Sequence, residues 1–142
     1  MDREKYLNLA RVSWQTAFEH VDAIASASHY GTLEPEDERE WTQSAIVSLH
    51  AFVGAAYMAY AAESCIKADY TEAHSLQGMM AAGGKRQWKA LSPQFRKDIA
   101  AIDRAYSNLH TKHASAPWEA NGQFLFCRRV FDGVTTSFLK TA

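Results

Sequence analysis

Two residue types that handle phosphate groups, an arginine and a histidine, occur six positions apart in the segment Arg104–His110, which reads RAYSNLH. An imidazole titrates near neutral pH, so it can take the proton of a ribose 2′-hydroxyl or give one to the leaving oxygen. A guanidinium can hold the phosphate and stabilise the charge that builds during transfer. Ser107 and Asn108 lie between the two and are candidates to orient the scissile phosphate. The segment is therefore the candidate site for metal-free RNA cleavage, with Arg104 and His110 as the catalytic pair.

A helix predicted over residues 92–113 positions this segment. Ser92 suits the N-cap, and Pro93 suits the first helical position, where no amide hydrogen is needed. One face of the helix recurs at steps of three and four residues: Phe95, Ile99, Ile102, Tyr106, Leu109 and His113. On an ideal helix Arg104 and His110 lie about 120° apart, so one of them must sit where the helix frays or turns.

A second candidate binding segment is the predicted loop GGKRQWKALSP, residues 83–93, with Lys85, Arg86 and Trp88. Basic residues around an aromatic ring can hold a single-stranded nucleic acid by charge and stacking. The alternative is that Trp88 packs the loop onto the core.

The net charge of −1 conceals an asymmetry between the two halves of the chain. Residues 1–70 hold 5 Lys and Arg against 11 Asp and Glu, a balance of −6, and residues 71–142 hold 10 against 5, a balance of +5. A positive field over the candidate site favours an anionic ligand such as RNA or a nucleotide. Alternatively, the two halves attract each other within the fold or across a dimer.

The rest of the chain predicts further helices and no strand. A first helix runs from a cap at Asp2 to about Ser28, with an apolar face at Leu7, Ala10, Trp14, Ala17, Val21 and Ile24. A second, alanine-rich helix runs from about Glu38 to Ala68. Its small residues imply close approach by several neighbouring helices or by a second subunit. A short third helix begins at Thr71 and ends at Gly83–Gly84, and a last helix carries an apolar stripe at Phe124, Cys127, Phe131, Val134 and Phe138. The fold class predicted for the single domain 1–142 is an all-α, four-helix up-and-down bundle with one short additional helix.

Other features of the sequence bear on compartment and cofactors. No membrane span is expected, and the N-terminus lacks the apolar region of a signal peptide. Cys65 and Cys127 are isolated among apolar residues and suit core positions in a reducing cytoplasm. His110 and His113 could share a helix face, but no cysteine or acidic residue nearby completes a zinc site. We therefore expect a cytoplasmic protein without metal or cofactor.

The same segments resemble the HEPN superfamily (higher eukaryotes and prokaryotes nucleotide-binding domain). Its pattern is an arginine, four to six residues and a histidine near the end of a helix, which Arg104–His110 fits. Residues 55–76, AAYMAYAAESCIKADYTEAHSL, are similar to the helix and loop that precede this motif, and the resemblance spans about residues 41–140. It implies a four-helix bundle, often a homodimer in which the two motifs meet, and a toxin-like, metal-independent endoribonuclease.

Under the resemblance Arg104 is the phosphate-binding cation and His110 the general acid–base. A small nucleotidyltransferase antitoxin is the partner that many such proteins have. Where many active members carry Asn or Asp directly after the arginine, this chain has Ala105, and Asn108 is the candidate to take over that role. Other members have lost catalysis, so the alternative function is a non-catalytic helical protein–protein interaction module.

Overall fold

The computed structural model describes residues 3–64, 66, 75–82, 85–109, 115–119 and 122–139. In these residues every regular element is a helix, which confirms the all-α class. The described helices are α1 (Arg3–His29), α2 (Pro35–Glu63), α4 (Leu76–Ala82), α5 (Lys85–Ala90), α6 (Pro93–Ser107) and α7 (Gln123–Ser137). Two short helices, α4 and α5, therefore stand where the sequence predicted one.

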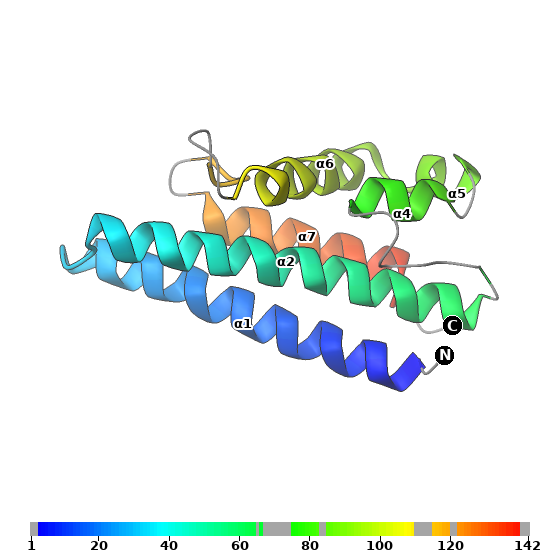
Figure 1. The fold of residues 1–142 in the computed structure, drawn as a ribbon, viewed down its shortest axis with the longest axis horizontal. Coiled ribbons are helices and arrows are strands. Elements are labelled where there is room, and N and C mark those ends of the chain that lie inside the picture. Colours follow the sequence, from blue (N-terminus) through cyan, green and yellow to red (C-terminus); the bar gives the residue numbers. More distant parts are fainter. Residues whose placement is uncertain are drawn as a thin grey trace.

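The long helix α2 lies at the centre of the arrangement. Figure 1 shows α1 and α2 side by side and running in opposite directions, with α6 across α2 from α1. Helix α7 lies beside α2 and α6 and also contacts α1. The short helices α4 and α5 lie near the C-terminal half of α2, and α4 packs against both α2 and α6. Both chain ends lie at this same end of the molecule.

The first helix has the boundaries and the buried face that its apolar spacing predicts. Ala10, Ala17, Val21 and Ile24 are buried, and α1 makes its main packing contact with α2. After α1 the chain turns at Gly31, whose φ of 69° is a left-handed conformation that glycine adopts without steric cost. Asp2, the predicted cap, lies outside the described residues.

The second helix begins and ends earlier than the sequence predicted. It begins at Pro35, which fills the first helical position, and acidic residues follow in the first turn, where the helix dipole favours them. It ends at Glu63 rather than near Ala68 because the backbone turns back there. The amide of Ile66 donates to the carbonyl of Ala61 at 2.8 Å, and the Ile66 side chain packs on the core.

The alanines of α2 pack within this chain. Ala55, Ala56, Ala59 and Ala61 are all buried, so neighbouring helices of the same chain account for the small residues. By length and composition α2 is also apolar enough to cross a membrane, contrary to our expectation that no segment would be. However, 72% of its most apolar stretch is buried inside the protein, as in the core helix of a soluble domain.

Both short helices differ from prediction. Helix α4 begins at Leu76, with the Ser75 hydroxyl accepting from the amide of Gly78 at 2.9 Å, while the predicted cap Thr71 lies outside the described residues. The predicted loop 83–93 contains α5 instead, because KRQWKA consists of residues that tolerate helical geometry well. Met79 and Met80 are buried and fill the core beneath α4.

Helix α6 begins as predicted and ends sooner. The Ser92 hydroxyl accepts from the amide of Phe95 at 3.2 Å, and Phe95, Ile99 and Ile102 are buried. The helix ends at Ser107 rather than continuing to His113, and residues 110–113 lie outside the described part. Tyr106, predicted on the buried face, is 37% exposed.

Helix α7 (Gln123–Ser137) and the residue after it confirm part of the predicted stripe: Cys127, Val134 and Phe138 are buried, but Phe124 and Phe131 are not. Phe126, Cys127, Val130 and Val134 face the core, whereas Phe124 and Phe131 are about two-fifths exposed (41% and 38%). The two aromatic rings lie against α1 instead, with the Phe131 ring centroid 4.7 Å from that of Trp14. Gly133 lets α6 approach α7 closely, since a Cβ at that position would lie 2.4 Å from Cδ1 of Phe95.

Candidate functional site

Arg104 lies on the last turn of α6, and its side chain is exposed to solvent. Its guanidinium makes no ion pair or hydrogen bond with any residue that the structure describes. It borders an open groove between α4 and α6, about 480 Å³ in volume. The lining residues are Ser75, Gln77, Gly78, Ala81, Asp103, Arg104 and Ser107. The arginine is therefore available to an anionic ligand that enters this groove.

Asp103 fixes the wall of the groove. Its carboxylate oxygens accept from the amides of Leu76 at 2.7 Å and Gln77 at 3.0 Å. Two charge-assisted hydrogen bonds of this kind hold the first turn of α4 against α6. The carboxylate is thereby engaged by backbone amides, and the guanidinium of the adjacent Arg104 remains open to solvent.

His50 supports the same turn of α6 from below, a contact that the sequence reasoning missed. It is only 5% exposed, its ring stacks on Tyr106 with centroids 3.9 Å apart, and its Nε2 lies 3.8 Å from Oδ1 of Asp103. Burial lowers the pKa of His50, and the charge of Asp103 opposes this shift. His50 thus contacts the residues on both sides of the arginine, Asp103 and Tyr106. The sequence did hold a signal for this contact, because His50 lies one turn after Ile46 on the apolar face of α2, where a buried side chain is expected.

The chain is anchored to α2 just before His110. Asn108 ends α6, with its amide donating to the carbonyl of Arg104 at 3.1 Å. Leu109 is buried, and its carbonyl accepts from Nε2 of Gln43 at 2.9 Å. The helix thus ends before the position of His110. His110 itself lies outside the described residues.

The other predicted site residues differ in whether they line the groove. Ser107 is exposed and borders the groove beside Arg104, whereas Asn108 is half-buried at the helix end and does not line it. Trp88 is partly buried and packs against the core, as its alternative interpretation expects, and it is not among the residues that line the groove. Lys85 and Arg86 belong to α5, but their side chains lie outside the described part.

Ala105 occupies the position where the family pattern often has a polar residue. It is 5% exposed and forms a small apolar cluster with Ile46 of α2 and Leu109. A side chain at this position therefore faces α2 rather than the groove, and Ala105 itself takes no part in binding there. Its apolar contact instead helps to seat the end of α6.

No set of metal ligands forms in the part of the chain that the structure describes. There, no three His, Cys, Asp or Glu side chains lie close enough together to hold a metal ion. Cys127 is buried, and burial raises the pKa of its thiol to about 12, so it is a core residue and not a nucleophile. Cys65 lies outside the described residues.

Comparisons with protein-family models, with curated proteins and with solved structures found no match to this chain. The functional interpretation therefore depends on the residues of the groove and of the segment that follows it.

Proposed function

We propose that this protein is an HEPN-like ribonuclease that binds RNA in the groove between α4 and α6 and cleaves it without a metal ion. The observation that carries the proposal is the exposed guanidinium of Arg104, which borders a groove and has no ion-pair partner among the described residues. An arginine kept open in this way suits a phosphodiester, which accepts two parallel hydrogen bonds from a guanidinium.

In the proposed reaction the imidazole of His110 takes the proton of the ribose 2′-hydroxyl. The 2′-oxygen then bonds to phosphorus, the bond from phosphorus to the 5′-oxygen breaks, and the proton is returned to that oxygen. Arg104 stabilises the negative charge on the phosphoryl oxygens. The products are a 2′,3′-cyclic phosphate and a 5′-hydroxyl. Ser107, beside Arg104 on the groove wall, orients the phosphate.

Paired variants test the two assigned roles. Purified wild type, Arg104→Ala and His110→Ala are incubated with mixed cellular RNA in EDTA, and cleavage is followed on denaturing gels. We expect His110→Ala to lose about 10²–10⁴-fold in rate and Arg104→Ala about 10²–10³-fold. The matched controls are Arg128→Ala and His29→Ala, exposed residues of the same types outside the groove. Cleavage by His110→Ala at the wild-type rate, with its circular dichroism unchanged, would refute the assignment.

The proposal extends to the fold and to the assembly. The four longer helices are interpreted as an up-and-down bundle to which α4 and α5 are added. A homodimer that places two Arg104–His110 segments together would turn the open groove into a cleft. In this interpretation a nucleotidyltransferase-like antitoxin is the partner that restrains the enzyme.

One observation favours a second function, that of a non-catalytic protein–protein interaction module. Partly exposed aromatic rings form a strip across α1 and α7: the Phe18 and Phe124 ring centroids are 5.9 Å apart, and Phe131 continues the strip. Exposed apolar surface of this kind marks contact sites. Light scattering on wild type and on Phe18→Ser/Phe124→Ser tests this function, which predicts an oligomer only for the wild type and no RNA turnover.

A further inference from the structure

A second cavity is separate from the Arg104 groove. It has a volume of about 790 Å³ and lies among α2, α5, α6 and α7. It opens beside the first half of α6, whereas Arg104 lies on the last turn, and the two cavities share no lining residue. Its volume falls in the range of about 300–1,000 Å³ that is typical of small-molecule sites.

Aromatic rings form the apolar part of this cavity. The centroids of the Tyr57 and Phe138 rings are 5.4 Å apart, those of Tyr60 and Phe138 are 5.6 Å apart, and those of Phe95 and Phe138 are 5.7 Å apart. All four residues line the cavity, together with Met80 and Leu91. Such a surface favours a flat, ring-containing ligand, since stacked and edge-on aromatic contacts add to the burial of apolar area.

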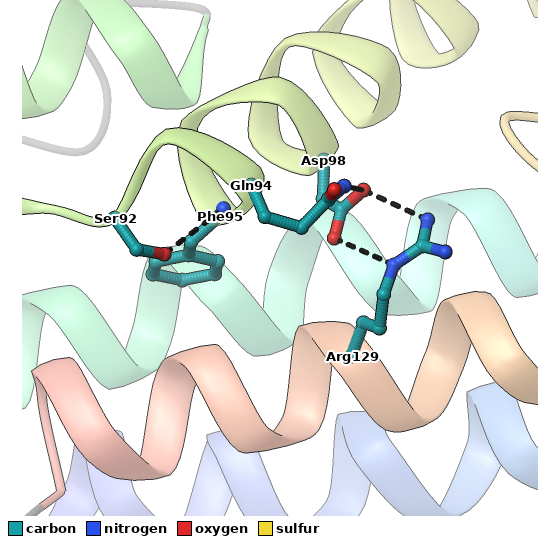
Figure 2. Close-up of polar contacts among 5 residues, drawn as sticks. All are labelled: Ser92, Gln94, Phe95, Asp98 and Arg129. Atoms are coloured by element: carbon teal, nitrogen blue, oxygen red, sulfur yellow. Dashed lines mark hydrogen bonds and ion pairs between the residues drawn. The ribbon is translucent and has the colours of Figure 1, made fainter.

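The charged groups of the wall neutralise each other. Figure 2 shows Arg129 of α7 pointing at Asp98 of α6: its Nε lies 3.2 Å from Oδ2 and its Nη2 lies 3.0 Å from Oδ1. Gln94 adds a hydrogen bond from its Nε2 to Oδ1 at 3.0 Å. Of the charged residues that line the cavity, Asp132 is left, and it is exposed to water. The wall therefore offers no unpaired cation for an anionic ligand.

One polar group in the lining is incompletely satisfied. Tyr57 is 1% exposed, and its hydroxyl has no hydrogen-bond partner in the part of the chain that the structure describes. A buried hydroxyl without a partner is unfavourable, and in native structures such a group usually pairs with protein, water or a ligand. Burial also raises the pKa of Tyr57, so the group is a neutral O–H donor.

From these contacts we infer that this cavity is a binding site for a small, uncharged aromatic molecule whose hydrogen-bond acceptor pairs with the Tyr57 hydroxyl. The ring of the ligand lies against Tyr60, which is partly exposed, and its polar edge faces the exposed side chains that line the cavity, among them Gln94 and Thr136. The site is additional to the proposed ribonuclease site and does not depend on it.

Titration of the full-length protein with benzamide tests the inference, because benzamide combines an aromatic ring, a carbonyl acceptor and no charge. Binding is followed by NMR chemical shifts, with benzoate and benzylammonium as the charged analogues. We expect saturable one-to-one binding of benzamide, at least fivefold weaker binding of both ions, and shifts centred on the lining residues.

Three variants locate the site. Tyr57→Phe removes only the hydroxyl, so we expect benzamide to bind at least fivefold more weakly while the unfolding midpoint stays the same or rises. Thr136→Trp places a large ring at the mouth of the cavity and is expected to abolish binding. Thr135→Trp is its matched control: Thr135 is also exposed on α7 but does not line the cavity, and binding is expected to persist.

Four outcomes would overturn the inference. They are the absence of saturable binding up to the solubility of benzamide, tighter binding of benzylammonium or benzoate, equal affinity in Tyr57→Phe, and unchanged binding in Thr136→Trp. The folded state of each variant is checked by its circular dichroism and its unfolding midpoint.

Discussion

The ion pair between Asp98 and Arg129 predicts that removing one partner costs more stability than removing the other. The side chain of Asp98 is 4% exposed, whereas that of Arg129 is 39% exposed. Removing Arg129 therefore leaves a buried charge, whereas removing Asp98 leaves a charge that can reach water. In Arg129→Met the buried carboxylate keeps, among the residues that the structure describes, only the hydrogen bond from Gln94. Removing one partner of a buried pair costs about 3–5 kcal/mol. In Asp98→Leu no buried charge remains and the guanidinium turns to water, so the cost is smaller, about 1.5–3 kcal/mol, the range for a lost hydrogen bond to a charged group.

The double variant Asp98→Leu/Arg129→Met completes the cycle. Replacing a buried pair by apolar residues of similar size is often neutral, so we expect the double variant to be at least about 2 kcal/mol more stable than Arg129→Met. Unfolding in urea, followed by circular dichroism and extrapolated linearly to water, measures all four proteins. Equal costs for the two single variants, or costs that simply add in the double variant, would refute this reasoning.

Three further predictions concern single side chains. Gly133→Ala drives a Cβ to 2.4 Å from the Phe95 ring and is expected to lower the free energy of unfolding. The loss is about 1 kcal/mol or more, despite the better helix propensity of alanine. Thr135→Ala is the control, and a Gly133→Ala variant more stable than the wild type would show that the two helices do not pack this closely. Because the pKa of His50 is lowered from 6.5, the unfolded chain takes up a proton below about pH 6.5 that the folded protein does not. The free energy of unfolding is therefore expected to fall as the pH drops through that range. Urea titrations at several pH values should show a weaker pH dependence in His50→Phe, and the same dependence in the variant and the wild type would contradict this role of His50. Cys127, with a thiol pKa of about 12, should react with iodoacetamide only in urea when studied in a Cys65→Ser background. Labelling of the folded protein at the rate of a free thiol would show that Cys127 is not buried.

Local signals in the sequence were sufficient for the start of α6 and for the buried face of α1. Ser92 caps α6, and the spacing of Ala10, Ala17 and Val21 predicts the buried face of α1, because each depends on residues within a few turns. Helix boundaries set by tertiary contacts were predicted less well. The early end of α2 depends on Ile66 returning to the core, which the spacing within the helix does not indicate.

The candidate site was predictable as a segment but not as a groove. Arg104 and Ser107 are three residues apart and lie on one wall, as helical spacing requires. The opposite wall comes from α4, held there by Asp103, and the support beneath comes from His50, 53 positions earlier in the chain. Such pairings join distant segments and leave no periodic signal. For the same reason the Asp98–Arg129 pair and the Tyr57 cavity emerge only from the packed helices.

The chemistry of the RNA ends tests the central claim most directly. Fragments produced by the wild-type protein in EDTA are analysed for their 3′ and 5′ termini, with His110→Ala treated in parallel. Metal-free cleavage through Arg104 and His110 predicts 2′,3′-cyclic phosphates and 5′-hydroxyls from the wild type and no fragments from the variant. Fragments ending in 3′-hydroxyls, or identical fragments from His110→Ala, would contradict the account.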